Sequence, residues 1–131
     1  MKMLIVDNDE STVTTLSALL LSREKFQIDV ASGGQEGLEM MRAHPDYDLV
    51  LLDIMMPKVS GMDVCQAMVS DWKLREIPVL LMSSALPIPP QEFQQSLEKY
   101  SALSVVKGVI EKPFILDDLL KKIHETVRRP L

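Results

Sequence analysis

Five short apolar segments recur along the chain, at 2–6, 26–31, 48–53, 78–82 and 104–110. The segments 48–53 and 78–82 are apolar almost without interruption. A strand with one face in water alternates apolar and polar side chains, whereas a strand covered on both faces does not. The pattern therefore predicts five strands, with the third and fourth in the interior of a sheet.

Segments in which apolar residues recur at helical spacing separate the predicted strands. They lie at 11–25, 33–44, 61–72, 90–100 and 116–129. In the first of them Val13, Leu16 and Leu20 form one apolar stripe, and Ser11 and Thr12 are expected near the cap of the helix. The last begins with acidic residues and ends with basic ones, which suits the helix dipole.

Strand and helix alternate five times, and this order is typical of an α/β fold with right-handed crossovers. We predict a single doubly wound, five-stranded parallel sheet with the flavodoxin-like strand order 2-1-3-4-5. A length of 131 residues suits one domain, which we expect to span 1–131. We expect no DNA-reading domain within it.

Composition narrows the possible functions. The net charge of −5 argues against nucleic acid as a partner of this chain by itself. The single cysteine, Cys65, excludes an internal disulfide and fits a reducing cytoplasm. The sequence has no apolar run of transmembrane length and no signal peptide, so we expect a cytoplasmic protein with no membrane partner.

Polar side chains stand where the predicted strands end. Asp7 follows the first strand, Asp53 ends the third, Ser83 follows the fourth and Lys112 follows the fifth. In the predicted order these four strands are neighbours, and ligands of such sheets bind at the carboxyl ends of the strands. A carboxylate can accept a phosphoryl group, and Mg²⁺, lysine and a hydroxyl can bind phosphoryl oxygens. The set therefore indicates a phosphoryl-transfer site.

Four segments resemble the receiver domains of response regulators, the CheY-like domains of two-component signalling. LLDIMMPKVSGMDV (51–64) resembles the phosphoacceptor segment, and IVDND (5–9) resembles the acidic pair after the first strand. PVLLMSSA (78–85) and EKPF (111–114) resemble the segments that carry the hydroxyl and the lysine. The resemblance covers essentially the whole chain in order.

The resemblance implies a role for each residue of the site. Asp53 would be the phosphoacceptor, and Ser83 and Lys112 would contact the phosphoryl group. Mg²⁺ would be bound by Asp7, Asn8, Asp53 and the backbone carbonyl of Met55. The peptide bond between Lys112 and Pro113 would be cis.

The resemblance also implies a signalling protein and not an enzyme, although one that assists its own phosphotransfer and dephosphorylation. A histidine kinase or a histidine phosphotransfer protein would donate the phosphoryl group. Phosphorylation would switch a surface that binds a downstream protein, which the sequence does not identify.

Two other functions stay open. Asn8 stands where relatives carry a second acidic residue, and Val109 stands where they often carry an aromatic one, so a pseudo-receiver that binds partners without phosphorylation is an alternative. Asp7, Asp9 and Ser11 also match the D-x-D-x-[T/S] motif of haloacid-dehalogenase-type phosphatases. In that more remote alternative Asp7 is the nucleophile and Asp9 a general acid.

Overall fold

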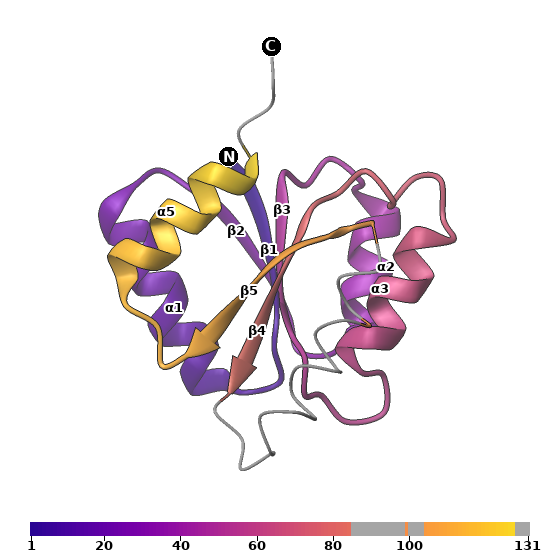
Figure 1. Cartoon of the computed structure of the whole chain (residues 1–131), viewed down its shortest axis with the longest axis horizontal. Helices are drawn as coiled ribbons and strands as arrows, with labels where there is room; N and C mark the ends of the chain where they lie inside the picture. Colours follow the sequence, from indigo (N-terminus) through magenta and orange to yellow (C-terminus); the bar gives the residue numbers. More distant parts are fainter. Residues whose placement is uncertain (85–98, 100–103, 128–131) are drawn as a thin grey trace.

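A computed structural model describes residues 1–84, 99 and 104–127 of the chain (Figure 1). Five parallel strands form one sheet in the order β2-β1-β3-β4-β5, which confirms the predicted topology. The strands are β1 (Lys2–Val6), β2 (Gln27–Ala31), β3 (Leu49–Asp53), β4 (Val79–Ser84) and β5 (Val106–Lys112). The helices are α1 (Glu10–Arg23), α2 (Gly34–Ala43), α3 (Gly61–Val69) and α5 (Leu116–Val127).

The predicted boundaries need small corrections. The first strand is as predicted, β4 extends to Ser84, and β5 lies two residues further along the chain than the segment 104–110. Helix α3 ends at Val69, before the predicted end at residue 72. The cap of α1 is Asp9, and Ser11 and Thr12 belong to the first turn. The helix predicted at 90–100 lies outside the described residues, apart from Lys99.

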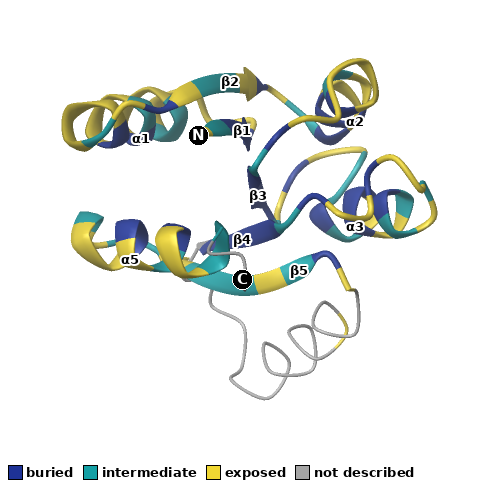
Figure 2. Ribbon diagram, turned by 90° about the horizontal axis from the view of Figure 1, so that it is seen from above, coloured by how far each residue is buried: buried dark blue, intermediate teal, exposed yellow. Residues whose placement is uncertain are grey.

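Helices cover both faces of the sheet. Figure 2 shows α1 and α5 on one face and α2 and α3 on the other. Successive side chains of a strand point to opposite faces, so Met3 and Ile5 pack toward α1 and α5 while Leu4 and Val6 pack in the cluster with α2 and α3. All five residues of β3 are buried. This two-sided burial is the reason that the central strands are apolar without alternation.

The edge strand β2 is tied to the sheet by a polar cluster around Tyr47. The Tyr47 hydroxyl donates to Asp29 Oδ2 at 2.6 Å. The Lys2 ammonium lies 4.8 Å from the centre of the Tyr47 ring, and the Lys2 backbone N–H donates to Asp48 Oδ2 at 2.8 Å. Burial and the bond to Asp29 raise the pKa of Tyr47 far above its ordinary value. The cluster joins β1, β2 and the segment before β3.

We predict that Tyr47→Phe lowers the free energy of unfolding by about 1–2 kcal/mol, because the half-buried Asp29 carboxylate loses a donor. Urea denaturation measures this change. In an Asp29→Ala background the same substitution should cost much less. An equal cost in both backgrounds would contradict an energetic contribution from this hydrogen bond.

Candidate functional site

The carboxyl ends of four neighbouring strands bring the polar residues together. Asp7 follows β1, Asp53 ends β3 and Lys112 ends β5. Ser83 lies in β4, where it pairs with Glu111 of β5. Asp7, Asp53 and Ser83 are only 2%, 5% and 5% exposed, and they are the buried polar residues among those that the structure describes. The site therefore lies at the sheet edge that the sequence indicated.

One ammonium group serves two carboxylates. The Lys112 Nζ atom lies 2.9 Å from Asp7 Oδ2 and 3.9 Å from Asp53 Oδ1. A backbone N–H group also donates a hydrogen bond to each carboxylate. The N–H of Asp9 donates to Asp7 Oδ1 at 2.9 Å, and the N–H of Met55 donates to Asp53 Oδ1 at 3.2 Å. These contacts fix the direction in which each carboxylate points.

The pKa of Asp53 is raised to about 6. Burial is the largest cause, because it disfavours the charged carboxylate, and the negative charge of Asp7 adds to it. Lys112 and the Met55 N–H act in the opposite direction. Burial and the charge of Asp7 thus outweigh the attraction of Lys112, and the pKa of Asp53 stays above its ordinary value.

The loop after Asp53 is folded back against the end of β3. The Gly61 N–H donates to the carbonyl oxygen of Ile54 at 3.2 Å. A Cβ atom on Gly61 would lie only 2.9 Å from the Asp53 carbonyl oxygen, so this close approach requires glycine. Helix α3 then begins with a capping box between Ser60 and Asp63. The loop is held at both of its ends.

The remaining predicted site residues lie on the rim. Asn8 is exposed on the loop between β1 and α1, and the Met55 side chain is exposed while its N–H faces Asp53. Val109 is half-buried and packs against the core on the α2 and α3 face. The bond between Lys112 and Pro113 is cis, as expected. Within the described part of the chain, no three His, Cys, Asp or Glu side chains form a metal-binding group.

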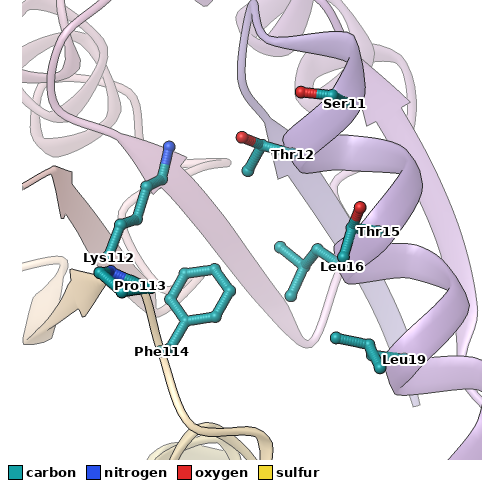
Figure 3. Close-up of a pocket in the computed structure, with 8 residues that line it drawn as sticks. All are labelled: Ser11, Thr12, Thr15, Leu16, Leu19, Lys112, Pro113 and Phe114. Carbon is teal, nitrogen blue, oxygen red and sulfur yellow. The ribbon is translucent and has the colours of Figure 1, made fainter.

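A groove that the sequence did not predict opens beside Lys112 (Figure 3). It has a volume of about 550 Å³ and lies between the start of α1 and the segment after β5. Figure 3 shows Lys112 and the Phe114 ring facing the α1 side chains across it. The residues that line it are Ser11, Thr12, Thr15, Leu16, Leu19, Lys112, Pro113 and Phe114. One turn beyond Leu19, Arg23 pairs with Asp117 of α5 at 2.9 Å.

Asp9 also has a structural role, which differs from the general acid of the phosphatase alternative. It is the N-cap of α1, and its side chain accepts hydrogen bonds from Ser11 and Thr12. These bonds lower the pKa of Asp9. Its residue type was a signal in the sequence, because aspartate is among the residues preferred at a helix N-cap. The groove has no such signal, since it depends on how α1 packs beside β5.

The sequence model of the response regulator receiver domain matches residues 3–124. The chain belongs to this family. Receiver domains are signalling proteins and not enzymes in the usual sense, and the match supports a place in two-component signalling. No helix in the described part of this receiver domain is long and apolar enough to span a membrane.

Curated relatives and solved structures agree with the family. The cell cycle transcriptional regulator CtrA of Caulobacter vibrioides is 30% identical over 129 residues, which are 98% of this chain and 51% of CtrA. Response regulator ArlR of Staphylococcus aureus is 26% identical, with 98% of this chain and 54% of ArlR covered. This receiver domain thus spans about half the length of these relatives.

Among solved structures, the N-terminal domain of a response regulator receiver protein from Methanoculleus marisnigri is 32% identical with a TM-score of 0.69, and 98% of each chain is covered. Chemotaxis protein CheY4 of Vibrio cholerae has a TM-score of 0.79 at 23% identity, with 95% of this chain and 97% of that chain covered. The latter likeness concerns the fold alone.

We predict that Asp53→Asn stabilises the receiver domain at neutral pH in the absence of divalent metal. The folded protein holds the Asp53 proton more tightly than the unfolded chain does, because the folded pKa of about 6 exceeds the ordinary value of 3.8. Stability from this group is therefore present below the ordinary pKa and is lost as pH rises through the folded pKa. The asparagine should add roughly 1–3 kcal/mol at about pH 7.5 and little at about pH 4.

Urea denaturation in a chelating buffer at both pH values measures the difference. Asp118→Asn is the matched control, because Asp118 is exposed. A gain from Asp53→Asn that is the same at both pH values would show that the raised pKa is not its source.

Proposed function

We propose that the chain is a phosphoacceptor that takes a phosphoryl group from a phosphohistidine onto Asp53, as one receiver domain over residues 1–131. The observation that supports this most is the buried Asp53 carboxylate at the end of β3, with the Lys112 ammonium 3.9 Å away, in a chain of the receiver family. A histidine kinase or a histidine phosphotransfer protein is the donor, and an unidentified protein receives the signal.

In the transfer, a carboxylate oxygen of Asp53 bonds to phosphorus as the bond from phosphorus to the histidine nitrogen breaks. The electron pair of that bond returns to the imidazole. Asp53 must be ionised to act as the nucleophile, and Lys112 favours the ionised form. Lys112 and the Ser83 hydroxyl then contact oxygens of the acyl phosphate. Burial keeps bulk water away from the bond that forms.

The residues present fit Mg²⁺. This ion is commonly bound by one or two carboxylates together with phosphate oxygens and water, and Asp7 and Asp53 supply two carboxylates. The charge of Asp7 already raises the pKa of Asp53, and a cation held by these two carboxylates would relieve that repulsion. The side-chain oxygen of Asn8 and the Met55 carbonyl complete the proposed ligands. When bound, the metal neutralises charge on the transferring phosphoryl group.

The contacts of Asp9 do not support the phosphatase alternative, in which this residue would be the general acid. Both oxygens of Asp9 accept hydrogen bonds from the first turn of α1, so they are engaged as a helix cap. The pseudo-receiver remains the second candidate, because Asn8 removes one negative charge from the place where relatives carry an acid. Failure of labelling in the first experiment below would favour it.

The groove beside Lys112 gives the donor a place to dock. A protein that presents a phosphohistidine to Asp53 must cover the surface around the strand ends, and this groove adjoins it. Leu16, Leu19 and Phe114 make its walls apolar, and Leu19 is 40% exposed in the free chain. Burying these side chains under a protein donor would contribute to the binding affinity of that donor. A small-molecule donor such as acetyl phosphate would not need this contact.

We predict that acetyl phosphate with Mg²⁺ adds the mass of one phosphoryl group to the wild-type chain, and that Asp53→Asn abolishes this gain. Asp118→Asn, which changes an exposed carboxylate, should be labelled like the wild type. Intact-protein mass spectrometry gives the result. Labelling that survives in Asp53→Asn would mean that another residue is the acceptor.

A second prediction separates docking from chemistry. Leu19→Asp should slow transfer from a phosphohistidine donor by roughly tenfold, because a charge replaces an apolar contact in the groove. The rate with acetyl phosphate should stay the same. Leu21→Asp is the matched control, since Leu21 is also exposed on α1 but does not line the groove. If both variants slow transfer equally, the groove is not the docking surface.

A further inference from the structure

The loop between β1 and α1 carries three polar residues in a row, and only the first is buried. Asp7 is buried, with a fully buried side chain, whereas Asn8 and Asp9 are exposed. Because Asn8 is uncharged, Asp7 is the one carboxylate that this loop directs to the proposed metal. Metal binding should therefore depend more on the orientation of Asp7 than it would in a loop with two acidic residues.

The Asp9 side chain is occupied by α1. Its Oδ1 atom accepts the Ser11 N–H at 3.1 Å and the Ser11 hydroxyl at 2.8 Å. Its Oδ2 atom accepts the Thr12 hydroxyl at 2.8 Å. Both oxygens thus face the first turn of the helix, and they satisfy a donor that the helix start would otherwise leave open.

The Asp9 backbone N–H has its partner outside the helix. Its N–H donates to Asp7 Oδ1 at 2.9 Å, while its carbonyl oxygen accepts the first helical bond, from Val13, at 3.1 Å. Asp7 is therefore held between the Asp9 N–H on Oδ1 and the Lys112 ammonium on Oδ2. Asp9 is thus both the cap of α1 and the residue whose N–H binds the Asp7 carboxylate.

We propose that Asp9 is a positioning residue for Asp7: its cap fixes the loop so that the Asp9 N–H orients the Asp7 carboxylate toward the metal. In this role the charge of Asp9 is dispensable and its capping oxygen is not. Partners that orient a metal ligand typically change metal affinity by about 10–100-fold when they are lost. The inference rests on the metal site of the proposed function.

The test is a calorimetric Mg²⁺ titration of the full chain, with the amide resonance of residue 9 followed by NMR. Asp9→Asn and Asp9→Ser keep a good capping oxygen, so their Mg²⁺ affinity should stay within about twofold of the wild type. Asp9→Ala removes the cap and should weaken Mg²⁺ by roughly tenfold. Its residue 9 amide should also lose the shift that marks the bond to Asp7.

Two further variants keep the result unambiguous. Ala18→Gly weakens α1 at an exposed position away from the cap, and its Mg²⁺ affinity should equal that of the wild type. Asn8→Asp should tighten Mg²⁺, because hard cations follow the charge of their ligands.

The other outcomes would overturn the inference in distinct ways. If Asp9→Asn and Asp9→Ala lost the same amount of Mg²⁺ affinity, the negative charge of Asp9, and not its cap, would be what the metal requires. An unchanged affinity in Asp9→Ala, or an equal loss in Ala18→Gly, would remove the positioning role. A wild-type chain that binds no Mg²⁺, while Asn8→Asp does, would overturn the proposed metal site and this inference together.

Discussion

The contact of one ammonium group with two buried carboxylates is the constraint on which the rest of this structure depends. Two negative charges out of water are costly unless a positive charge is nearby. Here that charge comes from Lys112, 105 residues along the chain from Asp7. The strand order, in which β1, β3, β4 and β5 are neighbours, brings these ends together. The charge pairing in the site thus depends on the strand order of the sheet.

The two cores hold the strand ends in register. Each interior strand contributes side chains to both faces of the sheet. A shift of a strand by one residue would move every side chain to the opposite face and break both cores. The loops at the carboxyl ends are held in other ways. Asp9 caps α1, Ser60 and Asp63 cap α3, and Gly61 lets the backbone of the loop after Asp53 fold close to β3. Rigid strands and capped helices together leave the carboxylates little freedom.

Most of the fold could be predicted from the sequence, because the periodicity of apolar residues depends only on which face of an element is covered. The convergence of Asp7, Asp53 and Lys112 also followed from strand order. Asp9 could be predicted as a helix cap from its residue type, but the hydrogen bond from its backbone N–H to Asp7 required the structure. The groove required the packing of α1 beside Phe114, a contact between segments about 100 residues apart for which the sequence has no local signal.

The short segment from Lys112 to Phe114 has a consequence for how the protein responds to its partners. Lys112 touches the two carboxylates, and two residues later the Phe114 ring lines the groove. A partner that shifts the ring acts on the backbone that holds the ammonium. If binding at the site favours one position of this segment, it changes the affinity of the groove for its partner. By reciprocity, a partner in the groove changes binding at the site by the same free energy. The groove and the site would then be linked in both directions, so that a change at Asp53 would alter the affinity of the groove for whatever binds there.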